Sequence, residues 1–154
     1  MKFTTRIIGK RKRIALVAHD NKKTALVDWA LSNREMLAKH ELFATGTTGK
    51  LLEDALDRTI TKMYSGPLGG DQQLGAKIAD GAIDVMIFFW DPMEAQPHDS
   101  DVKALLRVAV AWNVIIANDP ATADFIITSP FMNAEYGASV PDYSEYLNRQ
   151  IDKK

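Results

Sequence analysis

The sequence predicts an α/β protein: a three-layer, Rossmann-like sandwich built on a mainly parallel five-stranded sheet. Short apolar runs alternate along the chain with segments whose apolar residues recur at helical spacing. Two of the runs, IALVA at 14–18 and VMIFF at 85–89, are apolar at every position, which is typical of strands that helices cover on both faces. The chain has the length of one domain and no linker or internal repeat, so we expect a single domain over residues 1–154.

Each element of this sandwich follows from its local pattern. We expect strands wherever an apolar run is strand-sized, namely at 13–18, 41–45, 60–65, 83–90 and 114–118. We expect helices between them, where apolar residues recur with the helical period, namely at 22–39, 48–56, 70–80 and 101–112. Gly81 stands where a glycine ends a helix. Right-handed crossovers should join the parallel strands, and residues 131–154, with the helix-like YSEYLNRQ, should form a final packing segment.

Charge and composition exclude several classes of partner. Lys and Arg number 19 and Asp and Glu 20, so no overall field gathers nucleic acid or anionic lipid. The absence of cysteine excludes disulfides and thiolate catalysis. The basic start MKFTTRIIGKRKR precedes only five apolar residues, too few for a secretion signal, and no run approaches the ~18 apolar residues of a membrane span. We therefore expect a cytoplasmic protein with no nucleic-acid or membrane partner, in which residues 10–13 lead through solvent into the first buried strand.

The unusual chemistry of the chain lies in the loops that follow the five expected strands. In an open parallel sheet these loops converge beyond the carboxyl ends of the strands, where ligands bind. The loops are HDNKK (19–23), TGTTG (45–49), SGPLGGD (65–71), DPMEAQPHDSD (91–101) and NDPATAD (118–124). Of the three histidines only His40 lies elsewhere, and we expect it on the surface.

Several of these loops suit an anion such as phosphate or carboxylate. TGTTG combines threonine hydroxyls, a flexible glycine and the N–H groups of a helix start. A threonine-rich helix cap is the alternative interpretation, and a nucleotide site lacks support because neither GxxxxGK[ST] nor GxGxxG occurs. The residues that could share one anion are Lys23, Thr45, Gly46, Thr47, Thr48, Ser65 and Gly66.

Acids and a histidine accompany this anion site. Asp91, His98, Asp99 and Asp101 could ligate a metal, but no second histidine pairs with His98, and acids also favour the start of a helix. We therefore expect no metal. A carboxylate base, a neutral imidazole donor and a phosphate cradle fit acid–base chemistry on a small phosphorylated molecule better.

Asp71 has two interpretations. It follows the Pro-Gly-Gly turn of SGPLGGD and precedes a helical pattern, so it could cap that helix. The glycines of the same turn could instead clear room for a ligand that Asp71 faces.

The loops and their flanks together resemble the methylglyoxal synthase family over residues 4–147. The blocks that carry the resemblance stand in family order and spacing: ALVAHD (15–20), FATGTTG (43–49), SGPLGGDQQLGA (65–76), IFFWDP (87–92), PHDSDVKALLR (97–107) and ATADFIITSP (121–130). The resemblance implies a carbon–oxygen lyase that cleaves dihydroxyacetone phosphate to methylglyoxal and inorganic phosphate through an enediolate. It further implies a homohexamer without metal or organic cofactor, inhibited by inorganic phosphate.

Carried over position by position, the resemblance implies roles for individual residues. Asp71 matches the catalytic acid/base, and Asp20, Asp91 and Asp101 match acids around it. The substrate-binding residues are matched by His19, Lys23, Thr45, Gly46, Thr47, Thr48, Ser65, Gly66 and His98. Arg149 is the candidate for an arginine that the family brings near the phosphate. The chain departs from the family pattern at Ser100 and at Asn118-Asp119-Pro120.

Two other functions remain open at this point. A non-catalytic regulatory domain of the same fold, which resembles the effector domain of carbamoyl phosphate synthetases, would bind a phosphorylated metabolite without needing the acids. An aldose–ketose isomerase would share the enediolate chemistry. The presence of Asp71, His98 and Asp101 together favours the enzyme over the regulatory domain.

Overall fold

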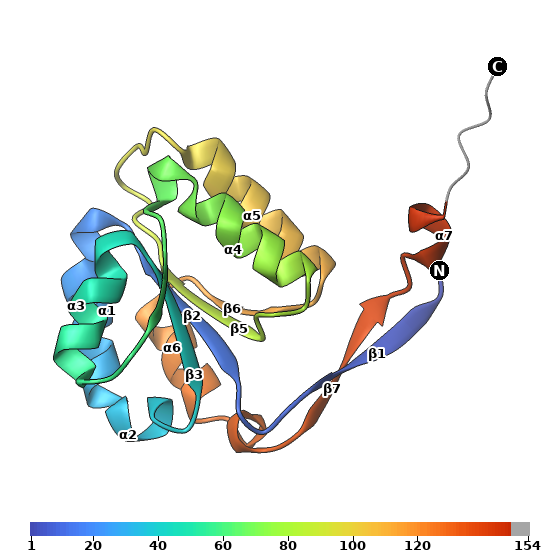
Figure 1. The fold of residues 1–154 in the computed structure, drawn as a ribbon, viewed down its shortest axis with the longest axis horizontal. Coiled ribbons are helices and arrows are strands. Elements are labelled where there is room, and N and C mark those ends of the chain that lie inside the picture. The colour runs from blue at the N-terminus through green and yellow to red at the C-terminus, as the bar shows by residue number, and fades with distance from the viewer. Residues whose placement is uncertain (149–154) are drawn as a thin grey trace.

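The computed structural model describes residues 1–148, so Arg149 lies outside the described part of the chain. It shows a five-stranded, fully parallel sheet in the order β4-β3-β2-β5-β6 (Figure 1). The strands are β2 (Arg13–Ala18), β3 (Glu41–Thr45), β4 (Thr61–Met63), β5 (Val85–Phe89) and β6 (Ile115–Ala117). The predicted α/β sandwich is therefore confirmed, with β4, β5 and β6 shorter than expected.

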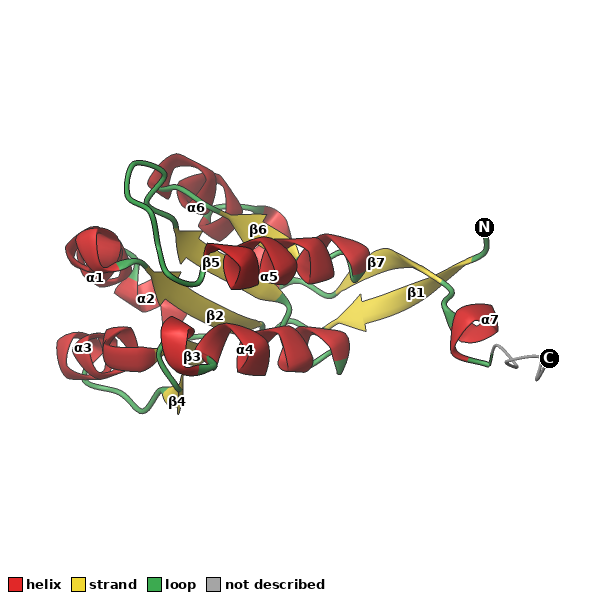
Figure 2. Ribbon diagram, turned by 90° about the horizontal axis from the view of Figure 1, so that it is seen from above, coloured by secondary structure: helices red, strands yellow, loops and turns green. Residues whose placement is uncertain are grey.

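Helices cover both faces of this sheet (Figures 1 and 2). On one face lie α4 (Gly70–Ala79) and α5 (Asp99–Ala111), and on the other lie α1 (Lys23–Ser32), α3 (Gly46–Leu56) and α6 (Pro120–Ile127). Successive strand residues point to opposite faces, so Leu16 packs in the core under α1, α3 and α6, and Val17 in the core under α4 and α5. This alternation explains why the central strands are apolar throughout.

Two helical segments differ from the prediction. The expected helix 22–39 is divided at Asn33, whose amide donates to the Trp29 carbonyl and separates α1 from the short α2 (Arg34–Leu37). α6 was not predicted, although Asp119 caps it by accepting from the Thr122 N–H at 2.8 Å and Pro120 opens it. None of the helices among residues 1–148 is long and apolar enough to cross a membrane.

Segments near the two ends of the described residues form a two-stranded ribbon that was not predicted from the sequence. β1 (Phe3–Ile8) pairs antiparallel with β7 (Tyr136–Pro141), and the ribbon extends away from the sheet toward the short helix α7 (Ser144–Leu147) (Figure 1). Residues 3–8, to which no element was assigned, are thus the partner of the expected final packing segment. More than a hundred residues separate the two strands along the chain, so no local turn signal marks the pairing.

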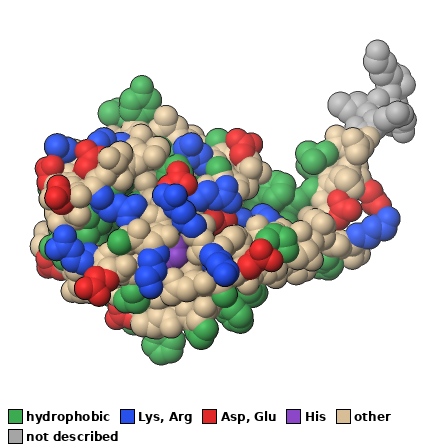
Figure 3. Space-filling model, turned by 60° about the horizontal axis from the view of Figure 1, so that its bottom comes forward, with side chains coloured by type: hydrophobic (Ala, Val, Ile, Leu, Met, Phe, Trp, Pro, Cys, Tyr) green, Lys and Arg blue, Asp and Glu red, His purple; other side chains and the backbone are tan. Residues whose placement is uncertain are grey.

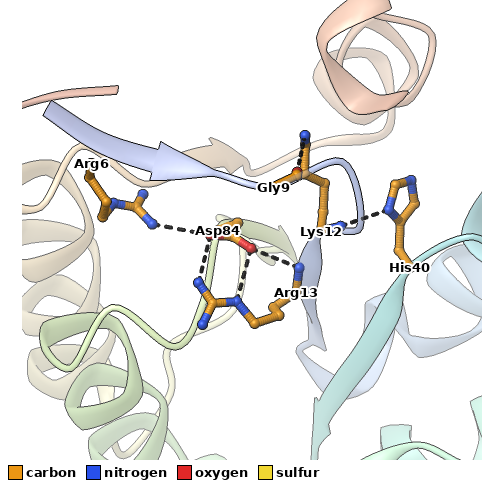
Figure 4. A network of polar contacts seen from close by, with 6 residues as sticks. All are labelled: Arg6, Gly9, Lys12, Arg13, His40 and Asp84. Carbon is orange, nitrogen blue, oxygen red and sulfur yellow. Dashed lines mark hydrogen bonds and ion pairs between the residues drawn. The ribbon is translucent and has the colours of Figure 1, made fainter. Parts of the chain in front are cut away.

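A polar network ties this ribbon to the sheet (Figure 4). The buried Asp84 carboxylate accepts from Arg6 of β1 at 3.1 Å and from Arg13 of β2 at 3.0 Å. Arg13 also holds the pKa of Asp84 below its usual range, against the effect of burial.

Two residues of the same region are buried where solvent exposure was expected. Lys12 donates from Nζ to the carbonyls of Gly9 and Ala134, both at 2.6 Å, rather than leading through solvent. His40 is only 1% exposed, and its Nδ1 accepts the N–H of Lys12 at 2.9 Å, which gives that buried backbone group a partner. The surface assignment of His40 was therefore wrong.

Candidate functional site

A polar cavity of about 80 Å³ lies at the carboxyl ends of β2, β3, β4 and β5. It is lined by nearly all of the residues expected at a site: His19, Asp20, Lys23, Thr45, Gly46, Thr47, Thr48, Ser65, Gly66, Asp71 and His98. Asp91 and Asp101 do not line it, and neither does the loop 118–124. Pro67 and Gln96, which sequence reasoning did not single out, do. Gln96 stands in a loop rich in other polar residues, so no signal distinguished it.

The start of α3 forms one wall of this cavity. Thr45 precedes the helix without capping it through its side chain, and Thr48 in the first turn is buried. The N–H groups of a first helical turn have no partner within their own helix, so they suit an anion. Glycine is required at position 46 for two reasons. Its φ of +54° is unfavourable for other residues, and a Cβ at this position would lie 2.9 Å from Ser65 Cα.

One lysine faces the same wall. Lys23 Nζ donates to Thr47 Oγ1 and pairs with Asp20 Oδ1, both at 2.6 Å. The ammonium holds the pKa of Asp20 below its usual range. Lys23 therefore brings a positive charge to the threonine loop, and Asp20 orients it.

Asp71 lies in the first turn of α4 but does not act as a side-chain cap. Gly69 is the N-cap, and no side-chain hydrogen bond caps this helix. The Asp71 side chain is 3% exposed, and its Oδ2 has no hydrogen-bond partner among the described residues. His98 Nε2 is 3.5 Å away from that oxygen. The geometry thus favours the ligand-facing interpretation.

The electrostatics of Asp71 follow from this burial. Burial raises the pKa of Asp71 because it disfavours the charged form, His98 acts in the opposite direction, and the charge of Asp101 adds to the increase. Asp101 therefore influences the carboxylate by its field although it does not line the cavity.

The glycines before Asp71 have separate tasks. A Cβ on Gly66 would lie 2.8 Å from His98 Nε2 and 3.1 Å from Asp71 Oδ2, so this glycine leaves the space between the two side chains open. Gly69 has a φ of +103°, and a Cβ on Gly70 would lie 1.9 Å from the Tyr64 carbonyl oxygen. Only Gly66 clears room at the site, and the Gly-Gly pair serves the turn.

His19 presents an imidazole of defined protonation to the cavity. Its Nδ1 accepts the N–H of Asp91 at 3.0 Å, so Nδ1 carries no proton. Its Nε2 is buried and has no partner among residues 1–148. Burial lowers the pKa of His19, the nearby His98 lowers it further, and neighbouring carboxylates oppose both. His19 is therefore a neutral donor through Nε2 at pH 7.

The site offers little to a metal ion. Among the described residues, no group of three or more His, Asp and Glu side chains has an arrangement that could hold one. The polar atoms that remain free in the cavity are suited to hydrogen bonding with a small anionic molecule instead.

Comparison with known proteins yields consistent matches. Residues 25–118 match a family model described as the MGS-like domain. The chain is 54% identical over 153 residues to methylglyoxal synthase of Saccharophagus degradans, covering 99% of each protein. It is 56% identical over 140 residues to methylglyoxal synthase of Coxiella burnetii, covering 91% of this chain and 98% of the relative. The crystal structure of methylglyoxal synthase from Elizabethkingia anophelis NUHP1 superposes with a TM-score of 0.90 at 58% identity, covering 98% of this chain and 99% of that one.

Proposed function

The chain belongs to the methylglyoxal synthase family and is a lyase, and on that basis we propose that it converts dihydroxyacetone phosphate into methylglyoxal and inorganic phosphate through an enediolate. Asp71 is the general base in this proposal. The observation that carries it is the Asp71 carboxylate, which is buried in the cavity with a free Oδ2. A carboxylate that only caps a helix would not need to be buried in a cavity with one oxygen free of hydrogen bonds.

The first step is removal of a proton from the hydroxymethyl carbon beside the ketone. A solvated aspartate with a pKa near 3.9 is a weak base for such a proton, and the raised pKa of Asp71 improves the match. The electron pair of the broken C–H bond forms the carbon–carbon double bond, and the ketone oxygen becomes negative. Asp71 holds the proton.

Hydrogen-bond donors then stabilise the developing negative oxygen. His19 offers its Nε2–H, and the His98 ring lies edge-on to the His19 ring with 5.7 Å between their centroids. Preorganised donors of this kind act strongly where water is excluded. Together the two imidazoles would fix the plane of the enediolate.

The second step is loss of phosphate. The proton of the terminal hydroxyl passes to the leaving oxygen, that hydroxyl oxygen becomes the aldehyde carbonyl, and the π electrons of the enediolate form a new double bond to the carbon that bears the phosphate. The C–O bond to phosphate breaks with its electrons on the phosphate oxygen, so hydrogen phosphate leaves as a dianion. The resulting enolate takes the proton held by Asp71 at its terminal carbon and becomes methylglyoxal, which restores the Asp71 carboxylate. Lys23, the first turn of α3 and Ser65 stabilise the departing dianion. This route uses side chains and backbone of this chain alone.

The remaining family expectations are part of the same proposal. Residues 1–154 act as one domain, which assembles into a homohexamer in the cytoplasm, and inorganic phosphate inhibits the enzyme at the threonine loop. The inhibition follows physically, because the departing product and free phosphate fit the same donors.

The experiment that tests this function is product analysis of the purified protein with dihydroxyacetone phosphate. We expect methylglyoxal and an equal amount of inorganic phosphate, above the level that the substrate releases spontaneously. Glyceraldehyde 3-phosphate as the product would show an isomerase instead. Binding of the substrate without turnover would show a regulatory domain.

A further inference from the structure

Asp91 is buried close to the cavity without lining it, and both of its carboxylate oxygens and its backbone N–H have hydrogen-bond partners. Its Oδ1 accepts the N–H of Met93 at 3.0 Å, and its Oδ2 accepts from the Asn21 amide at 3.0 Å. Its backbone N–H donates to His19 Nδ1 at 3.0 Å. The carboxylate therefore fixes a turn whose N–H reaches the imidazole, rather than facing a ligand.

Asn21 connects two loops that build the site. It follows β2 by three residues, and its Nδ2 donates to Glu94 Oε2 as well as to Asp91. The loop that carries Asp91 and Glu94 continues to His98. Asn21 thus holds the segment after β5 against the segment that contains His19.

We infer that Asn21 and Asp91 are positioning residues of this site, which keep the Asp91 N–H on His19 Nδ1 and thereby keep the proton of His19 on Nε2, toward the cavity. The inference rests on the proposed function, in which that Nε2–H donates to a substrate oxygen. Neither residue touches the substrate.

The tautomer matters because a neutral imidazole has one donor and one acceptor nitrogen. With the proton on Nδ1, Nε2 would turn an acceptor lone pair toward the negative oxygen of the enediolate. The site would lose a donor and gain a repulsion. A backbone N–H held on Nδ1 prevents this, since that N–H can only donate.

A donor–acceptor exchange tests the inference. All variants carry Glu94→Gln, because an aspartate at position 21 would otherwise also be repelled by the Glu94 carboxylate. The Glu94→Gln variant alone serves as the reference. Asn21→Asp places two carboxylates face to face. Asp91→Asn keeps an oxygen for Met93 but turns an amide toward the Asn21 amide. The double exchange restores one donor and one acceptor with their order reversed.

The protonation of His19 is measured directly by nitrogen NMR of the substrate-free protein. His40 is an internal control, because its Nδ1 accepts the Lys12 N–H far from these loops. We expect each single exchange to reduce the Nε2-protonated population of His19 and to lower kcat/KM roughly tenfold, the scale of one lost hydrogen bond to a charged group, because that bond forms to the negative oxygen of the enediolate. The double exchange should return both quantities close to the reference, and His40 should not change.

Unchanged His19 signals and an unchanged kcat/KM in folded single variants would overturn the inference, as would a folded double variant that shows no recovery. Should an exchange variant fail to fold, Asn21→Ala answers the same question, with Asn133→Ala, an exposed amide outside the site, as its matched control. The proposed function fails separately: a His19 tautomer that responds as expected in a protein that makes no methylglyoxal would overturn the function alone.

Discussion

Burial shifts the pKa of an aspartate and of two histidines in this chain in opposite directions. It raises the pKa of Asp71 and lowers the pKa of His19 and of His40, because in each case the charged form loses its hydration. Asp71 and His19 line the cavity, and in the proposed reaction a more basic carboxylate favours proton abstraction while a neutral imidazole donates to the enediolate oxygen. His40 lies at the opposite end of β2 and β3, where the same effect bears on stability alone.

The pH dependence of stability reports on His40. Burial and the neighbouring cations Lys12, Lys39, Arg11 and Arg58 lower the pKa of His40 from 6.5 to about 4. Figure 3 shows a face on which Lys and Arg side chains gather around a histidine. Between these pH values the unfolded chain binds a proton that the folded chain does not. The free energy of unfolding should therefore fall by about 3 kcal/mol from this residue as the pH drops from 6.5 to 4.

The comparison of wild type with His40→Gln checks this expectation, because the amide oxygen can still accept the Lys12 N–H but does not titrate. Urea unfolding of both proteins across this pH range gives the free energy of unfolding of each as a function of pH, and the loss should be smaller in His40→Gln. Parallel losses of stability would show that His40 contributes nothing to the acid dependence.

Gly66→Ala tests the space between Asp71 and His98. The added Cβ would lie 2.8 Å from His98 Nε2, so one of the two side chains must move. We expect kcat/KM to fall roughly 100-fold, since misplacement of about 1 Å costs that much. Gly75→Ala in the interior of α4 is the control, because its Cβ meets only Leu105 Cδ1 at 3.9 Å. Steady-state kinetics that do not distinguish the two variants would contradict the close contact.

At the scale of elements, the proposal assigns anion binding to the start of α3 and the loop before it. We predict that Thr48→Ala weakens inhibition by inorganic phosphate about 10- to 100-fold, the range for a lost hydrogen bond to a charged group. Lys23→Ala should add a loss that shrinks at high salt, because that contribution is electrostatic. Thr128→Ala, at the far end of α6, is the control for the threonine change. Equal inhibition constants in all of these proteins would place the anion elsewhere.

The elements differ in how far the sequence predicts them. β2 and β3 have the predicted bounds, because all of their residues after the first are buried and a run of this kind is recognisable from the sequence alone. β1 and β7 were missed since their partners are distant in sequence and each is largely exposed. Eleven of the predicted site residues line one cavity because the order of strands brings their loops together. The place of Asp91 behind His19 depends on a backbone N–H, which no side-chain pattern reveals.

At the scale of the whole molecule, the ribbon and α6 carry large apolar side chains that are exposed in the single chain. Phe3 and Ile7 of β1 are 62% and 58% exposed, and Phe125 of α6 is 83% exposed. A two-stranded ribbon is only marginally stable on its own in water, and exposed apolar patches mark interaction surfaces. These features support the proposed homohexamer.

Light scattering of the purified protein tests this assembly. We predict a particle with six times the mass of one chain, and a smaller particle when Phe3 and Ile7 are both replaced by Asp. A protein that remains a single chain at micromolar concentration would contradict the proposed homohexamer.

The central claim is that Asp71 removes the proton that starts the reaction, and the turnover number of Asp71→Asn tests it most directly. The change keeps the size of the side chain and removes the base, so kcat should fall roughly 10²- to 10⁴-fold with little change in KM. Asp80→Asn, at the exposed end of the same helix, should turn over like wild type, and circular dichroism should show both variants folded. Turnover of folded Asp71→Asn at a rate near that of wild type would contradict the assignment of Asp71 as the base.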